Sequence, residues 1–190
     1  MDFAEQTAGA ADGFSFGWEL REQAGAVCTV GDAAADAAFV ADRPTDAITD
    51  ILHGLCGLYG PLPAERFFFR SEPVEFRWVL DRQGTDVDIS IYLFPDVRGG
   101  LGLPDSAGLL VWRSRQARGR FVHAVLDTAE AVLDGQGGRP ESAERPAGPG
   151  PLAALVELRR MHRRDDGCGA ACPPPASGEH PADRRRLPHA

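Results

Sequence analysis

The fold is decided by residues 73–94, which read PVEFRWVLDRQGTDVDISIYLF. Apolar and polar residues alternate on both sides of Gln83-Gly84, and this period of two is typical of half-buried strands. A two-residue turn at Gln83-Gly84 would place Trp78 opposite Ile89, and the apolar side chains of both strands would then meet on one face. We therefore predict an antiparallel hairpin at the centre of the fold.

The flanking sequence predicts five more strands and two helices. The strands are expected at residues 14–20, 26–30, 37–41, 66–70 and 109–116, and the helices between Thr45 and Gly60 and at 118–134. Residues 33–41 are also compatible with a helix, since alanine is a poor strand former. Thr45 is the expected N-cap of the first helix. The resulting fold class is α+β, a curved antiparallel sheet of six to seven strands with two helices packed on one face, in the order βββ-α-ββββ-α.

Composition divides the chain into three parts. Residues 1–12 are expected to be a flexible N-terminus, and residues 13–134 form the α+β domain. Residues 135–190 are rich in Pro, Gly, Ala and Arg and hold 9 of the 15 prolines, so we expect a mostly disordered tail. Within that tail, residues 151–164 are compatible with a helix.

Charge and composition restrict the classes of partner. The formal net charge is −8, which disfavours nucleic acid as a partner of the domain and favours a basic protein. No stretch is long and apolar enough to span a membrane, and the N-terminal residues lack the pattern of a secretory signal. We expect a cytoplasmic protein whose cysteines, Cys28 and Cys56 among them, are reduced thiols. No motif in the sequence indicates a cofactor.

Three aspartates lie near the predicted hairpin turn. With the turn at Gln83-Gly84, Asp81 would lie opposite Asp86, and Asp88 follows on the second strand. Carboxylates this close can bind a divalent cation through oxygen. The alternative is a solvated strand face whose like charges deter edge pairing.

Two histidines are candidates for acid–base chemistry or metal ligation. His123 and Asp127 lie four residues apart on the predicted second helix, so they share a face and the carboxylate could orient the imidazole. His53 lies near Asp46 and Asp50 on the first helix. For both histidines the alternative is an ordinary position on a solvated helix face.

A basic run marks the junction between the last strand and the second helix. It consists of Arg113, Arg115, Arg118 and Arg120. A helix N-terminus attracts anions, so a phosphate or an acidic partner segment could dock here. The alternative is that these arginines pair with the surrounding acids.

The tail holds a group of residues that resembles part of a zinc site. Cys168 and Cys172 have a tolerated ligand spacing, but His180 and His189 are nine residues apart, whereas zinc-binding histidines usually lie three to five apart. Chance occurrence in a biased tail is the alternative.

Three segments carry a resemblance to known proteins. They are Phe16-x-Trp18-Glu19-Leu20-Arg21, Thr45-Asp46-Ala47-Ile48 and Glu72-Pro73-Val74-Glu75-Phe76-Arg77-Trp78. Over about residues 14–134 the chain resembles a loose group of small uncharacterised α+β proteins from high-GC actinobacteria. That group has no established function, so the resemblance implies no activity and no site, and the tail departs from it.

Two functional hypotheses follow. The first is a non-enzymatic binding module, similar to an immunity protein, which would present its acidic surface to a basic partner. The second is a small hydrolase or metal-dependent enzyme that would use Asp86, Asp88, His123 or Asp127, provided that these side chains converge in one pocket. The sequence favours the first, because it contains no complete catalytic constellation.

Overall fold

The computed structural model of the protein describes residues 13–21, 25–96, 100, 102–135 and 150–168. The elements in chain order are β1 (Ser15–Arg21), β2 (Gly25–Gly31), β3 (Asp36–Ala41), α1 (Pro44–Gly57), β4 (Ala64–Ser71), β5 (Val74–Gln83), β6 (Asp86–Phe94), the 3-10 turn η1 (Asp105–Ala107), β7 (Leu109–Ala117), α3 (Arg118–Gly135) and α4 (Pro151–Asp165). The predicted α+β class is confirmed. The expected flexible N-terminus, residues 1–12, lies outside the described residues, as does most of the predicted tail.

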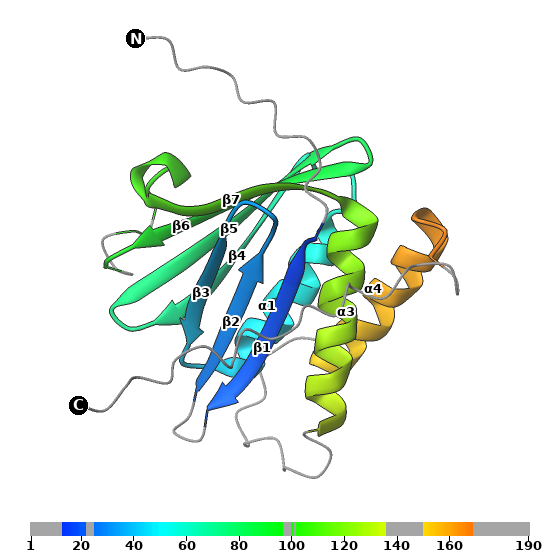
Figure 1. The fold of residues 1–190 in the computed structure, drawn as a ribbon, viewed down its shortest axis with the longest axis horizontal. Coiled ribbons are helices and arrows are strands. Elements are labelled where there is room, and N and C mark those ends of the chain that lie inside the picture. The colour runs from blue at the N-terminus through cyan, green and yellow to red at the C-terminus, as the bar shows by residue number, and fades with distance from the viewer. Residues whose placement is uncertain (1–12, 22–24, 97–99, 101, 136–149, 169–190) are drawn as a thin grey trace, which may run out of the picture.

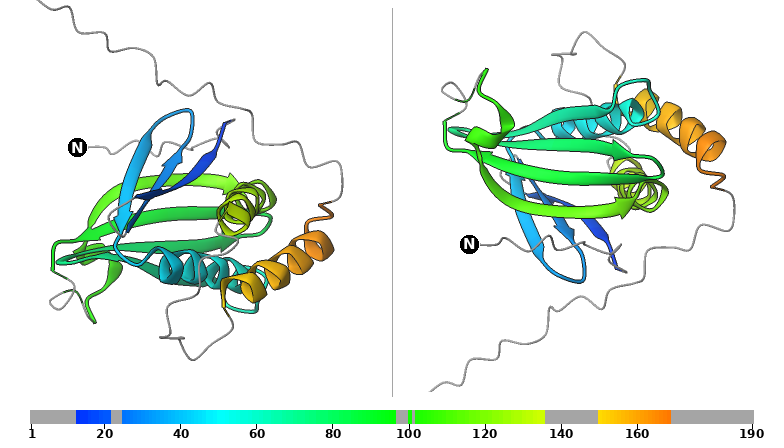
Figure 2. Two further views of the ribbon diagram at one scale, coloured as in Figure 1. Left: turned by 90° about the horizontal axis from the view of Figure 1, so that it is seen from below. Right: turned by 90° about the horizontal axis from the view of Figure 1, so that it is seen from above.

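The strands form two antiparallel sheets, β1-β2-β3 and β4-β5-β6-β7. The prediction of one sheet of six to seven strands with two helices is therefore wrong, because α1 separates β3 from β4 and the chain starts a second sheet. The three-stranded sheet lies on one side of the four-stranded sheet (Figures 1 and 2). Each sheet has one apolar face, and packing the two faces together buries both.

The predicted hairpin is present as β5 and β6, with a register that differs by two residues from the expected one. Trp78 lies opposite Ile91 rather than Ile89, because the turn is at Gly84-Thr85. Gly84 has a φ of +66°, which glycine adopts without steric cost and which the tight turns of hairpins require. A register shift of two residues keeps every side chain on its predicted face of the sheet, so the predicted apolar face is correct.

Aromatic rings join the two sheets. The ring of Phe39 in β3 lies 5.0 Å from that of Phe76 and 5.8 Å from that of Trp78, centroid to centroid. Trp18 of β1 lies 5.7 Å from Phe69 of β4. Edge-to-face pairs of this kind add to the stabilisation from apolar burial, and they fix how the sheets sit on each other.

The outer face of the four-stranded sheet carries a buried arginine. Arg77 donates hydrogen bonds to the backbone carbonyls of Gly100 and Leu103, and it forms ion pairs with Glu75 and Asp105. The loop that leads to η1 is thus held against the sheet. Phe68, the one outward ring of the Phe67–Phe69 run, lies under the same guanidinium at 5.5 Å.

Helix α1 begins differently from the prediction. Arg43 is the N-cap residue, but its side chain makes no capping hydrogen bond, and Pro44 is the first residue of the helix. Proline suits that position since it has no N–H to satisfy. Thr45 is therefore inside the helix and is not the cap, and its carbonyl accepts a hydrogen bond from the Thr49 hydroxyl.

Helix α4 packs against α1 and α3, and it lies where residues 151–164 were expected to be compatible with a helix. The predicted fold class had counted only the two helices packed on the sheet, so that part of the prediction is wrong. The buried residues of α4 are Ala154, Leu155, Leu158 and His162. Figure 1 shows α4 on the far side of α3 from β1. None of the helices in the described part of the chain is long and apolar enough to cross a membrane.

Candidate metal centre

A His-Asp pair lies on the side of α3 that faces α4. His123 Nε2 is 3.3 Å from Asp127 Oδ2, one helical turn further on. The His123 side chain is 22% exposed and that of Asp127 is 44% exposed. The carboxylate therefore holds one ring nitrogen, and the other, Nδ1, points away from Asp127.

Helix α4 repeats the same pattern. His162 and Asp166 are also four residues apart, and His162 Nδ1 lies 2.9 Å from Asp166 Oδ2. The His162 side chain is only 2% exposed. Its other ring nitrogen, Nε2, is buried and has no hydrogen-bond partner among the described residues. Buried polar atoms usually have a partner, and three other buried nitrogens of the described residues, Trp18 Nε1, Arg77 Nε and Trp78 Nε1, also lack one. Of the four, only His162 Nε2 belongs to a side chain that can ligate a metal ion.

The carboxylate of Asp166 joins all three helices. It accepts a hydrogen bond of 2.5 Å from the hydroxyl of Tyr59, which follows α1, and two from Arg118 at the start of α3. Burial alone would raise the pKa of Asp166, but the hydrogen bonds from His162, Arg118 and Tyr59 lower this pKa to about 2. Burial and the same carboxylate raise the pKa of Tyr59.

This network fixes which nitrogen of His162 carries the proton. The ionised Asp166 can only accept, so His162 Nδ1 must donate to it. In the neutral ring, Nε2 then carries a lone pair and no proton. A lone-pair nitrogen whose opposite N–H is held by a carboxylate is the usual state of a histidine that binds a metal ion.

The third donor comes from the turn after α4. Gly167, with a φ of +61°, reverses the chain in the way that glycine often ends a helix. The reversal brings Cys168 Sγ to 3.5 Å from His123 Nδ1. Ligands at about 2.3 Å (sulfur) and about 2.05 Å (nitrogen) from a tetrahedral zinc ion would lie roughly 3.6 Å apart, so this pair already has the required separation.

The three side chains form one cluster. One ligand atom each from His123, His162 and Cys168 lies within 4.8 Å of the others. The two imidazole centroids are 5.9 Å apart. In the part of the chain that the structure describes, this is the only group of at least three His, Cys, Asp or Glu side chains that could hold an ion.

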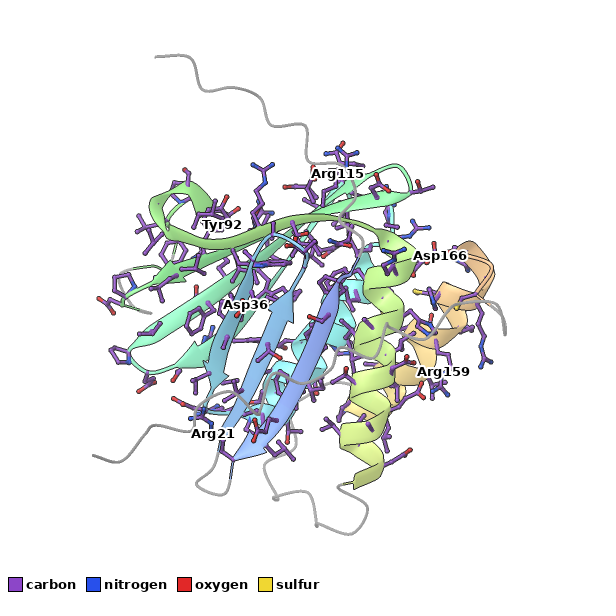
Figure 3. The ribbon with its side chains drawn as sticks, in the orientation of Figure 1. Arg21, Asp36, Tyr92, Arg115, Arg159 and Asp166 are labelled. Carbon is purple, nitrogen blue, oxygen red and sulfur yellow. The ribbon has the colours of Figure 1, made fainter. Side chains whose placement is uncertain are left out.

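The cluster opens onto a hollow of about 610 Å³ between α3 and α4. Its lining is mostly polar and consists of His123, Leu126, Asp127, Glu130, Arg159, His162, Arg163 and Cys168. Arg159 on α4 forms an ion pair with Glu130 on α3. Figure 3 shows Arg159 on the side of α4 nearest α3, and Asp166 beside the start of α3.

The hairpin aspartates are not part of this cluster. Asp81 lies opposite Asp88, not opposite Asp86 as the predicted register had it. Asp86 and Asp88 lie 3.3 Å and 3.9 Å from Arg115 Nε on β7. Among the described residues these carboxylates therefore pair with an arginine and form no group of metal ligands.

Two of the four arginines in the basic run form ion pairs, each with a different aspartate. Arg115 pairs with Asp86, and Arg118 pairs with Asp166 at 2.5 Å. Arg113 and Arg120 have exposed side chains on β7 and α3. His53 is exposed on α1.

Sequence reasoning identified His123 and Asp127 but missed His162, Asp166 and Tyr59. A signal was present, because His162-x-x-x-Asp166 repeats the spacing of His123-x-x-x-Asp127. Cys168 was considered only together with Cys172, His180 and His189, and these three lie outside the described residues.

Comparison with known proteins gives no further guide. No protein family, no curated protein and no solved structure matches this chain. The site is therefore interpreted from its own geometry.

Proposed function

We propose that the protein binds one zinc ion through Cys168, His123 and His162, and that it is a metal-dependent hydrolase. Two observations carry the proposal: one ligand atom each from His123, His162 and Cys168 lies within 4.8 Å of the others, and the buried Nε2 of His162 has no partner among the described residues. This is the second of the two sequence hypotheses, with His123 and Asp127 kept and the hairpin aspartates replaced by His162 and Cys168.

The donor types favour zinc over the hard cations. Thiolate and imidazole select zinc and related transition metals, whereas magnesium and calcium require oxygen ligands. The second contacts fit as well, since Asp127 and Asp166 each hold the outer nitrogen of one histidine. Such carboxylates fix the ring orientation and increase ligand basicity.

Among the described residues the cluster has three donors, and this number supports a catalytic role. Structural zinc sites have four protein ligands, whereas catalytic sites have three and keep one position for water or substrate. A zinc ion in such a site lowers the pKa of its bound water to about 7 and so supplies a nucleophile at neutral pH. The polar hollow beside Cys168 gives room for a substrate, and Arg163 in its wall offers a positive charge to an anionic group.

Metal binding is tested by titrating the purified full-length chain with Zn²⁺ in competition with a chromophoric chelator. We expect one ion per chain, with affinity lost in His123→Ala and Cys168→Ser and retained in His53→Ala, an exposed histidine outside the cluster. With Co²⁺ as the probe, a thiolate-to-metal absorption band should appear and should be absent in Cys168→Ser. Stoichiometric binding that survives in both cluster variants would exclude this site.

The hydrolase assignment is tested separately on the zinc-loaded protein. With 4-nitrophenyl acetate as the probe, we expect turnover above that of free zinc, and we expect His123→Ala to reduce it to background. If one ion binds through the three donors and no hydrolysis occurs with carboxylate or phosphate esters, the ion is structural and the hydrolase assignment is wrong.

The binding-module hypothesis stays a prediction, and one feature favours it. A hollow of about 540 Å³ beside the start of α1 is lined by Asp42, Asp46, Asp50 and Glu72 together with Arg43 and Arg70. Burial and then the charge of Asp46 raise the pKa of Asp50, which indicates mutual repulsion that a basic partner would relieve. Co-purification from native lysate should recover a basic protein that is lost with Asp46→Arg and kept with Asp36→Arg.

A further inference from the structure

The donors of the metal centre come from separate segments of the chain. His123 is on α3, His162 is on α4, and Cys168 follows α4. An ion held by all three would therefore cross-link the last helix to the rest of the protein. Cys168 and His123 are also 45 residues apart in the chain, so the ion would link two distant segments.

When α4 is docked, one of its buried polar atoms has no hydrogen-bond partner among the described residues. His162 is among the four buried residues of α4, yet its Nε2 has no partner within the described structure. The other contacts that hold α4 in place need no ion. They are the apolar packing of Ala154, Leu155 and Leu158, the hydrogen bonds and ion pair of Asp166, and the ion pair between Arg159 and Glu130. An ion at Nε2 would satisfy the buried atom, and undocking would separate the ion from at least one donor.

From this geometry we infer that the ion acts as a clamp, so that metal binding controls whether α4 is docked on α1 and α3. The inference rests on the proposed zinc site and adds its regulation. An ion that binds only the docked arrangement shifts the docking equilibrium by mass action, by about 100-fold when free metal is 100 times its dissociation constant. Metal supply would then set how often the face of α1 beneath α4 becomes accessible.

Cys56 provides a reporter that is not itself a ligand. It lies on α1 under α4, with its Sγ 3.9 Å from the backbone carbonyl of Ala154. Its side chain is half-buried, and undocking of α4 would expose it. Cys28, by contrast, is fully buried in the core between the sheets, so it reports opening of the whole fold.

The experiment is pulsed alkylation of the full-length chain, with and without Zn²⁺, and mass spectrometry to quantify each cysteine. We expect zinc at 100 times its dissociation constant to slow Cys56 labelling about 100-fold in wild type and in His53→Ala. His123→Ala and Cys168→Ser should label at the metal-free rate with or without zinc. Cys28 should stay unlabelled throughout.

Other outcomes separate the two proposals. If zinc binds with one ion per chain and Cys56 labelling does not change, the clamp is wrong while the metal site stands. If Cys28 reacts as fast as Cys56 in metal-free protein, the whole fold opens and the clamp is again wrong. Failure of zinc to bind wild type would remove both.

Discussion

At the scale of single residues, Asp166 is the contact on which three helices depend. Its side chain is 12% exposed, and that of its partner Arg118 is 13% exposed. Asp166→Ala would leave a largely buried guanidinium without its acid, and we expect a loss of about 2–4 kcal/mol of unfolding free energy. Tyr59→Phe removes one hydrogen bond from the same carboxylate and should cost about 1 kcal/mol. Urea denaturation measures both, and equal losses would contradict the central role of the Arg118 pair.

Two glycines of α1 give a matched pair of predictions. A Cβ at Gly54 would come within 2.5 Å of the ring of Phe67, a buried side chain stacked on Trp78. We expect Gly54→Ala to destabilise by about 1–3 kcal/mol despite the better helix propensity of alanine. At Gly57 the nearest atoms belong to the flexible end of Glu65, so Gly57→Ala should be neutral or stabilising by up to about 1 kcal/mol. Thermal melts should give a lower midpoint for Gly54→Ala and an equal or higher midpoint for Gly57→Ala.

The residue scale also shows what sequence can and cannot reveal about the site. The pair His123 and Asp127 was predictable because a helix brings residues four apart onto one face. The contact between Cys168 and His123 depends on how α4 crosses α3 and on the left-handed turn at Gly167. No local pattern encodes that crossing, so the third ligand could not be assigned from the sequence.

At the scale of elements, the β5–β6 turn decides the register of the sheet. Alternation alone allowed registers that differ by two, since each keeps the apolar residues on one face. The positive φ of Gly84 selects the observed one. We expect Gly84→Ala to cost about 1–2 kcal/mol because a Cβ is strained there, although nothing lies within 4 Å of it. Gly135→Ala, equally uncrowded at the end of α3, is the control and should be neutral by chemical denaturation.

The loop over the outer face of the four-stranded sheet should respond to pH through Asp105. Burial acts to raise the pKa of Asp105, but the hydrogen bonds and charges of Arg66 and Arg77 lower it below its ordinary value. A lowered folded pKa means that the carboxylate stabilises the fold above the unfolded value of about 3.9 and that this contribution is lost as the pH falls through the folded pKa. Asp105→Asn should therefore be less stable than wild type at neutral pH, and the difference should shrink in acid. A constant difference in urea midpoint across this range would contradict the assignment.

At the scale of the whole molecule, the sequence patterns could not predict that the strands divide into two sheets. Every predicted strand is present, because period-two alternation reports one buried face whichever sheet the strand joins. Which strands are neighbours depends on contacts such as that of Phe39 with Trp78, which are 39 residues apart in the chain. The helix expected at residues 151–164 is present as α4, but its docking on α1 and α3 could not be predicted, because its few buried apolar residues lie in a segment rich in arginine.

Removal of α4 tests whether the body folds alone. A chain ending at residue 149 loses the burial of Ala154, Leu155 and Leu158, worth roughly 3–6 kcal/mol at the usual values for leucine side chains. That is a large part of the stability of an ordinary domain, so we expect a clearly lower urea midpoint.

Leu158→Ala, at a side chain with 0% exposure, should show part of this loss, about 2–4 kcal/mol, whereas Leu152→Ala, at 64% exposure, should show none. If the shortened chain unfolds at the wild-type midpoint, then α4 adds nothing to the stability of the sheets, and its docking would have to be explained by the metal centre alone.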